Sequence, residues 1–277
     1  MLAALLALSA SLSWGSSSYL AGIESRRRSV WHVTALSQIA AAAVAGVALL
    51  VTGQAPPSSG DAAVLVLAGV ATAVGLVAFY RALAIGTMSI VSPIIAAEVL
   101  IPVTAGLLRG ERPGLPAYAG MVLTGAGVIL ISWAKRGESD HVARSAVLLA
   151  ILAAACWGLM LLALGVGGRD NPYWAVFDIR AASAAIIVIY VIATGRRLPL
   201  KGQNLPALFA VGLLLTAANI LFTVAAGLGF LSVASVLGSL SPVVVTGYAQ
   251  IFLGERLSAR QWTGFGTVFA GVVMLSS

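Results

Sequence analysis

From Gly202 to Gly254 the chain contains no Asp, Glu, Lys or Arg. A helix needs about 20 consecutive apolar residues to cross a bilayer, so this stretch is too long for one crossing. The sequence GLGFLS in its middle favours a break there, which leaves two helices. Because lipid offers no partner to a free backbone N–H or C=O group, apolar runs of this length cross membranes as helices. The stretch therefore excludes an ordinary soluble domain.

The composition extends this conclusion to the whole chain of 277 residues. Hydrophobic residues make up 60% and charged residues 9%, whereas soluble domains carry about 25% charged residues. The net charge of +7 comes from short basic clusters between apolar runs, a pattern typical of membrane loops and not of nucleic-acid binding. The single cysteine, Cys156, can form neither an intramolecular disulfide nor a cysteine metal site. We expect no cofactor and no metal.

Apolar runs recur along the chain, and the first one, followed by three arginines, is predicted to be a retained span, since a secretory signal has its basic residues first. The sequence predicts an all-α integral membrane protein with ten transmembrane helices. We place these helices at residues 2–22, 31–52, 62–84, 88–108, 115–134, 145–165, 173–195, 205–227, 231–252 and 259–276.

The second half of the chain repeats the first. Gly254-Glu255-Arg256 matches Gly110-Glu111-Arg112, and Gly120, Gly127 and Ser132 recur as Gly264, Gly271 and Ser276, all 144 positions later. Earlier in each half the offset is 143, at which SWG (residues 13–15) matches CWG (residues 156–158) and Trp31 matches Trp174. An inserted residue explains the change of offset. Two copies of one ancestral unit account for this pattern.

A unit of five crossings must traverse the membrane in opposite directions in its two copies, because five is odd. We therefore predict two inverted five-helix repeats, residues 1–134 and 145–277, joined by a loop at 135–144. Inverted repeats are a recurrent architecture of secondary transporters, in which the two halves open a central site to alternate sides. A static bundle that grew by duplication is the alternative.

Basic residues are unevenly divided between the two sets of predicted loops. One set holds only Arg109, Arg112 and Arg169. The loops after the first, third, fifth, seventh and ninth helices hold Arg26, Arg27, Arg28, Arg81, Lys135, Arg136, Arg144, Arg196, Arg197, Lys201, Arg256 and Arg260. Cytoplasmic loops carry the excess of Lys and Arg, so both termini are predicted to lie outside.

These features resemble the EamA family of the drug/metabolite transporter superfamily: ten spans, a duplicated unit, SWG and CWG in the leading helices, a serine-bearing fourth helix, and GER before each last helix. The chain also looks like amino-acid exporters of the YddG type. The resemblance implies a multi-pass protein of the bacterial inner membrane that exports small polar metabolites, with amino acids favoured. Many members have cytoplasmic termini, which is the reverse of the charge count.

Glu98 is the principal candidate for function, since it lies near the middle of the predicted fourth helix. A carboxylate at such a depth costs at least about 2.5 kcal/mol on insertion scales, and by default marks a functional site. We expect it to line a cavity and to couple transport to protons, with a purely structural role as the alternative. Pro93, Pro102 and Pro242 are expected to kink the fourth and ninth helices. At an offset of 144, Glu98 stands opposite Pro242.

Other polar and aromatic residues inside the spans are candidate walls of the same cavity, with close helix packing as the alternative for each. They are Trp14, Tyr80, Ser92, Trp157, Asn219, Phe222, Ser235 and Ser239. On a straight helix Glu98 would face away from Ser89, so the fourth helix must bend to bring both to one cavity. Tyr80 and Phe222 occupy nearly matched positions in the two halves.

Asp178 and Arg180 in the predicted seventh helix are candidates for a gate on the outer side. They lie two positions apart and cannot pair well with each other, and Arg180 is long enough to reach the interface by snorkelling. Glu111 and Glu255 are expected to cap the helices that they precede, or to anchor the preceding loops.

The partners implied are a small-molecule substrate and the lipid bilayer, for a chain that we expect to work as a monomer. The sequence contains no GxxxxGK[ST], HExxH or GxSxG motif, so neither ATP hydrolysis nor an enzymatic function is predicted. The alternatives to a secondary transporter are a passive channel or facilitator and a non-transporting membrane scaffold.

The charge count generates a testable topology. An epitope tag on either terminus is expected to be accessible to antibody in intact spheroplasts. If both tags react only after the membrane is broken, the termini are cytoplasmic and the common orientation of the family holds.

Overall fold

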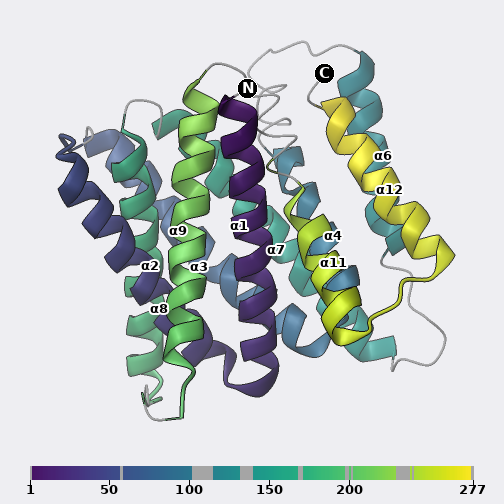
Figure 1. The fold of residues 1–277 in the computed structure, drawn as a ribbon, viewed down its shortest axis with the longest axis horizontal. Helices are drawn as coiled ribbons and strands as arrows, with labels where there is room; N and C mark the ends of the chain where they lie inside the picture. The colour runs from purple at the N-terminus through teal and green to yellow at the C-terminus, as the bar shows by residue number, and fades with distance from the viewer. Residues whose placement is uncertain are drawn as a thin grey trace.

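The structure, a computed structural model, describes residues 2–56, 59–101, 115–131, 140–167, 171–196, 200, 202–228, 238 and 240–275. These residues form a bundle of helices (Figure 1). In chain order the helices are α1 (Leu2–Arg27), α2 (Val30–Thr52), α3 (Ser59–Ile85), α4 (Met88–Ile95), the 3-10 helix η1 (Ala96–Val99), α6 (Leu115–Ile131), α7 (Asp140–Gly167), α8 (Pro172–Ala193), α9 (Leu205–Gly227), α11 (Ser241–Leu253) and α12 (Ala259–Leu275).

Local sequence sets several of these boundaries. Pro172 and Pro206 lie in the first turns of α8 and α9, where the missing proline N–H would have no helical partner in any case. Gly53 ends α2 with a φ of 60°, and its N–H bonds to the Leu49 carbonyl at 3.0 Å. These helix-starting prolines and this helix-ending glycine explain why the observed bounds of α2, α8 and α9 lie close to the predicted ones.

Within the described residues, five segments are long and apolar enough to cross a membrane: Val30–Thr52, Ala62–Ile85, Arg144–Leu164, Pro172–Ala193 and Leu205–Ala225. The described parts of α6, α12 and α11 are shorter, at 17, 17 and 13 residues. The count of ten crossings thus stays a prediction.

Large apolar side chains cover the outside of the bundle. Leu50, Leu115 and Ile251 expose 83%, 85% and 74% of their surface. A soluble protein rarely exposes apolar side chains over so much of its surface, whereas lipid tails cover them without cost. The exposed leucines and isoleucines are therefore the bilayer-facing surface of a membrane protein.

Contacts between the two halves are reciprocal. Helix α1 of the first half packs along α9 of the second half. Their counterparts, α7 and α3, pack along each other in the same way. Likewise α2 contacts α9 while α8 contacts α3, and α4 contacts α11. Reciprocal pairs of this kind arise when two similar units face each other about a twofold axis.

The glycines of SWG and CWG show the same reciprocity at atomic detail. A Cβ atom on Gly15 of α1 would lie 2.9 Å from the Ser241 carbonyl oxygen of α11, and one on Gly158 of α7 would lie 2.5 Å from the Glu98 carbonyl oxygen. Only glycine permits so close an approach between helices. Since Gly158 and Ser241 lie 143 positions after Gly15 and Glu98, respectively, these crossings pair Glu98 with Ser241. The pairing of Glu98 with Pro242 at an offset of 144 is therefore wrong.

The last helices of the two halves, α6 and α12, lie side by side at one end of the bundle (Figure 1). A Cβ atom on Gly127 would lie 2.8 Å from the Gly264 carbonyl oxygen, and one on Gly271 would lie 2.7 Å from the Gly120 carbonyl oxygen. Each contact is the other one displaced by 144 positions. The small residues of these two helices thus serve close packing within the chain.

The predicted fourth helix changes its winding in the middle. After Pro93 in α4, residues Ala96–Val99 form the 3-10 helix η1, which contains Glu98. Proline lacks the N–H that would bond to the carbonyl four residues earlier and its ring crowds that carbonyl, so a helix deforms around it. This deformation places Ser92 and Glu98, which lie on different faces of a straight helix, at one cavity. Pro102 and the rest of the predicted span lie outside the described residues.

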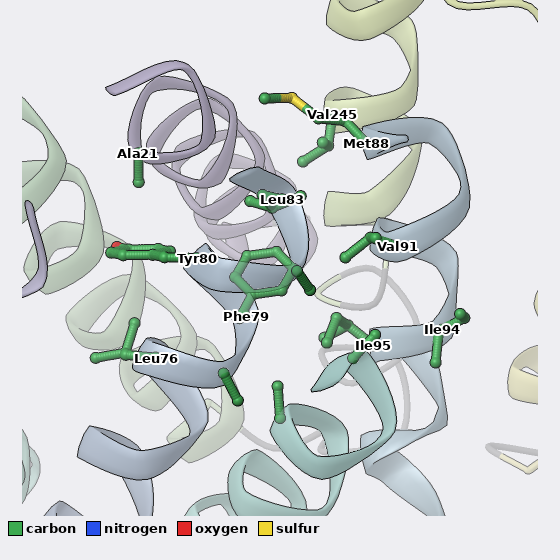
Figure 2. Packing of buried hydrophobic residues seen from close by; sticks show 14 of the residues in the cluster. Ala21, Leu76, Phe79, Tyr80, Leu83, Met88, Val91, Ile94, Ile95 and Val245 are labelled. Carbon is green, nitrogen blue, oxygen red and sulfur yellow. The ribbon is translucent and has the colours of Figure 1, made fainter. Parts of the chain in front are cut away.

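The main apolar cluster joins both halves through α3 and α4 (Figure 2). Phe79 lies on the α4 side, near Val91 and Ile95, whereas the Tyr80 ring points toward the other side of α3. Tyr80 is only 1% exposed. The core thus fixes α3 against α4 and turns the Phe79 ring, rather than the adjacent Tyr80 ring, toward α4.

Two glycines of α6 provide a matched test of the α6–α12 packing. Gly127→Ala is expected to lower the free energy of unfolding by about 1–3 kcal/mol, the cost typical of overpacking, because a new methyl group would meet the backbone of α12. Gly125→Ala meets no atom within 4 Å and should be neutral or stabilising by about 0.5–1 kcal/mol. Unfolding of purified protein in detergent, followed by circular dichroism, measures both. Equal stabilities for the two variants would contradict this packing.

Candidate functional site

A cavity lies between the two halves. Helices α1, α3 and α4 with η1 provide one part of its wall, and α7, α8, α9 and α11 provide the other. The predicted wall residues that do line it are Trp14, Ser92, Glu98, Trp157 and Asn219. Arg180, predicted to form a gate, and Pro242, predicted to kink a helix, line it as well. Both halves of the chain therefore contribute to a single site.

Two tryptophans stand at equivalent places in this wall. Trp14 packs on Phe222 with ring centroids 5.3 Å apart, and Trp157 packs on Phe79 at 5.0 Å. Phe222 lies 143 positions after Phe79, as Trp157 does after Trp14. The counterpart of Phe222 is thus Phe79 and not Tyr80. An offset of 143 applied to Phe222 identifies Phe79 as its counterpart from the sequence alone, but it does not show which ring faces the cavity.

Several predicted wall residues lie elsewhere. Tyr80 is packed in the core behind the wall, and Phe79 takes its place at the cavity. Phe222 supports the Trp14 ring without lining the cavity itself. Ser235, Ser239 and Pro102 lie outside the residues that the structure describes. The sequence prediction missed Ser18, Thr72, Met160, Leu161 and Ser241 as wall residues.

Asn219 fixes the orientation of one tryptophan. Its Oδ1 atom accepts a hydrogen bond from the Trp14 indole N–H at 2.9 Å, and it is 1% exposed. The Nδ2 atom of Asn219 has no hydrogen-bond partner among the described residues. A carboxamide that turns one end to a tryptophan and lines the cavity has donor capacity left for a polar ligand.

Two ionisable side chains face the cavity from opposite halves. Glu98 comes from η1 in the first half, and its carboxyl group has no hydrogen bond or ion pair with any other described residue. Arg180 comes from α8 in the second half and is 2% exposed. Its guanidinium donates from Nη1 to Gln38 Oε1 at 3.3 Å.

The burial of Arg180 corrects the expectation that it snorkels to the outer interface as part of a gate. The side chain points into the bundle, where Gln38 of α2 accepts its hydrogen bond. Asp178 is partly buried and its Oδ2 atom has no described hydrogen-bond partner. Two positions on a helix point to different sides, so only Arg180 of this pair reaches the cavity.

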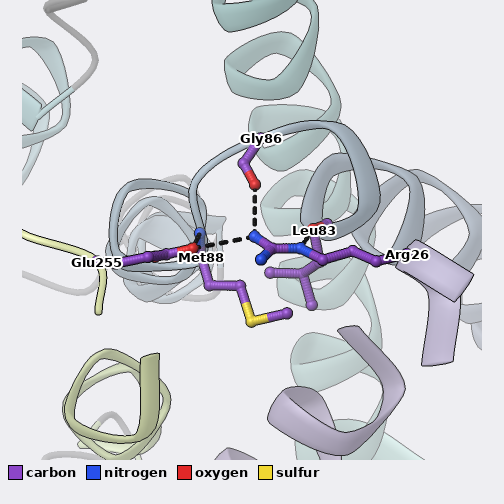
Figure 3. Close-up of polar contacts among 5 residues, drawn as sticks. All are labelled: Arg26, Leu83, Gly86, Met88 and Glu255. Carbon is purple, nitrogen blue, oxygen red and sulfur yellow. Dashed lines mark hydrogen bonds and ion pairs between the residues drawn. The ribbon is translucent and has the colours of Figure 1, made fainter. Parts of the chain in front are cut away.

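A polar cluster closes the bundle where α1 ends (Figure 3). The Arg26 guanidinium donates to the carbonyls of Leu83 and Gly86 at 2.9 and 2.8 Å, and to Glu255 Oε1 at 3.0 Å. The same Glu255 oxygen accepts a bond from the Met88 backbone N–H at 3.1 Å. We call these five residues the Arg26–Glu255 cluster. It joins α1, the α3–α4 turn and the GER loop of the second half.

Glu255 thus anchors a loop and satisfies the first turn of α4, rather than capping α12, which it precedes. The start of α12 has its own cap. Gln261 Oε1 accepts from the Ser258 backbone N–H at 2.9 Å, and the Gln261 N–H donates back to Ser258 Oγ at 3.3 Å, as in a capping box. Glu111, the equivalent of Glu255, lies outside the described residues.

A membrane-embedded helical bundle made of two related halves around an internal cavity is the architecture of a membrane transporter. The comparisons agree. The chain belongs to the EamA-like transporter family, which it matches twice, over residues 1–133 and 144–277. Members of this family are transporters and not enzymes.

Two individual proteins are similar to this chain. An uncharacterized transporter of Archaeoglobus fulgidus is 32% identical over 127 residues, which are 45% of each protein, so the match spans less than half of that relative. A solved structure described only as the crystal structure of a protein matches with a TM-score of 0.68 at 18% identity, over 98% of this chain and 95% of that one. At this identity the likeness concerns the fold.

Proposed function

We propose that the protein is a secondary transporter that exports small polar metabolites, above all amino acids, across the inner membrane by alternating access. The cavity walled by both repeats carries the proposal. A site shared by two similar halves opens to alternate sides when one half tilts against the other. Its walls combine aromatic and aliphatic side chains with few polar groups, as small-molecule sites do.

The reciprocal helix contacts support an inverted arrangement of the repeats. Gly15 crosses α11 and Gly158 crosses η1 at equivalent contacts. Tilting the first half against the second and tilting it the opposite way therefore lead to similar helix contacts. The same set of contacts then serves an outward-open and an inward-open state. We propose that α4 with η1 and α11, the fourth helices of the repeats, are the elements that move.

The Arg26–Glu255 cluster supports closure at one end. It lies where the basic loop after α1 begins, which the charge distribution assigns to the cytoplasm. Beside it Glu24 pairs with Arg28 and accepts a bond from Asn204 Nδ2 at 2.8 Å, which ties α1 to the loop before α9. We propose that these bonds hold the cytoplasmic end shut and break when the cavity opens to that side.

If Glu98 couples transport to protons, the flux of substrate should depend on the pH gradient across the membrane. Purified wild-type protein in proteoliposomes is expected to take up labelled L-leucine in counterflow and to respond to an imposed pH gradient. Glu98→Gln should insert and still exchange L-leucine downhill, although with weaker affinity, but its flux should not respond to the gradient, because the amide cannot bind and release a proton. An unchanged pH-driven flux in Glu98→Gln would leave Glu98 with a structural role only.

Closure by the Arg26–Glu255 cluster predicts a change in access to the cavity. In a Cys156→Ser background, Ser92→Cys places one thiol in the cavity wall. Adding Arg26→Gln, which removes the bonds to Leu83, Gly86 and Glu255, should increase its labelling by an impermeant thiol reagent applied at the end where α1 terminates, by about tenfold if roughly 1.4 kcal/mol of closure is lost.

Arg27→Gln is the matched control for this experiment. It removes the same positive charge as Arg26→Gln from the next position in the chain, whose side chain is exposed. Labelling that rises equally in Arg26→Gln and Arg27→Gln would show that net charge, and not the cluster, governs access.

A further inference from the structure

The two charged groups of the cavity break the symmetry of the repeats. Glu98 corresponds to Ser241, which lies 143 positions later, and Arg180 corresponds to Ser37, which lies 143 positions earlier. Each repeat therefore carries one charge where the other carries a serine. A scaffold with twofold symmetry cannot by itself orient a ligand, so these two substitutions give the cavity a positive side and a negative side.

Arg180 is held in place but not neutralised. Among the described residues it has no carboxylate within ion-pair distance, and its Nη1 atom donates a hydrogen bond to the neutral carboxamide of Gln38. The Nε atom is buried without a partner in the described part of the chain. A guanidinium carries five N–H donors, and leaving a buried charge without a counter-ion is costly.

The missing partner has a definite chemistry. A planar guanidinium binds a carboxylate through two parallel hydrogen bonds. The cavity that Arg180 faces is otherwise lined largely by apolar side chains, among them Leu76, Met160 and Leu161. Glu98 is the other ionisable group of that wall, and it too lacks a described partner. One ligand that carries a carboxylate, an ammonium group and an apolar side chain satisfies both.

We propose that Arg180, positioned by Gln38, binds the carboxylate of a zwitterionic substrate and that Glu98 receives its ammonium group. This inference rests on the proposed amino-acid transport and assigns the orientation of the substrate in the cavity. It also makes Arg180 a determinant of specificity: compounds that lack the carboxylate lose the bonds to the second repeat and keep those to the first.

Three probes of similar shape separate the two ends of the site. They are L-leucine, 4-methylpentanoate, which lacks the amine, and L-leucinol, which lacks the carboxylate. Their affinities for purified protein in detergent follow from the ligand-dependent rise of the unfolding midpoint. Arg180→Gln should weaken binding of L-leucine and 4-methylpentanoate about 10- to 100-fold, the range for a lost bond to a charged group, and should leave L-leucinol unchanged.

Gln38→Glu tests the same site with Arg180 retained. The new carboxylate would stand where Gln38 Oε1 now accepts the bond from Arg180, so it should neutralise the guanidinium and weaken the same two probes. Arg180→Lys, which keeps the charge but loses the planar fork, should fall between the wild type and Arg180→Gln. Gln38→Glu keeps the test decisive if Arg180→Gln does not fold.

The outcomes separate this inference from the proposed function. If the wild type neither binds nor exchanges L-leucine but binds 4-methylpentanoate through Arg180, the amino-acid substrate is wrong and the carboxylate site stands. If L-leucine is exchanged and both Arg180→Gln and Gln38→Glu bind it as the wild type does, transport stands and the site is wrong. Equal weakening of all three probes, or no binding of either carboxylate by the wild type, also overturns the site.

Discussion

The close crossing of α1 over α11, repeated by α7 over η1, is the contact on which the arrangement of the bundle depends. Gly15 and Gly158 allow backbone to meet backbone there, at the carbonyls of Ser241 and Glu98. In lipid, apolar side chains gain little by leaving their surroundings, so helices associate through close van der Waals contact between small residues. Each crossing brings a tryptophan, one position earlier, to the cavity wall. A larger residue at either glycine would separate the halves and displace that wall.

The cavity wall is similar in the two repeats in its aromatic residues but differs between them in its charged residues. The equivalent pairs, Trp14 with Trp157 and Phe222 with Phe79, build a similar wall on both sides of the cavity. Such a wall suits a transporter, because two states of comparable energy need comparable contacts. Glu98 and Arg180 have serines at their equivalent positions, and these charges have no described carboxylate or cationic partner. The two charges that break the symmetry thus lie where a ligand would meet them.

The fourth helix of the first repeat carries both an irregular, more easily opened backbone segment and the cavity residue Glu98. Pro93 and the 3-10 winding at Ala96–Val99 remove regular hydrogen bonds from the segment that carries Glu98. Segments with fewer regular bonds open at lower free energy than the long helices around them. The start of α4 is held by Glu255, which belongs to the other half of the chain. A change at the Arg26–Glu255 cluster therefore acts directly on the helix that positions Glu98.

The sequence by itself determined the membrane class, the duplication and the family, because apolar length, charge distribution and repeated motifs are properties of the chain read in order. It also singled out Trp14, Trp157, Asn219 and Glu98, since polar and large aromatic groups are costly or rare in mid-span. Only the tertiary structure decided that Phe79 and not Tyr80 faces the cavity, that Arg180 turns inward to Gln38, and that Glu255 bonds to Arg26 and Met88. These choices depend on which face of a helix meets a neighbour distant in sequence. Helical periodicity limits that choice without settling it, because close packing and hydrogen bonding across the two halves select one rotation of each helix.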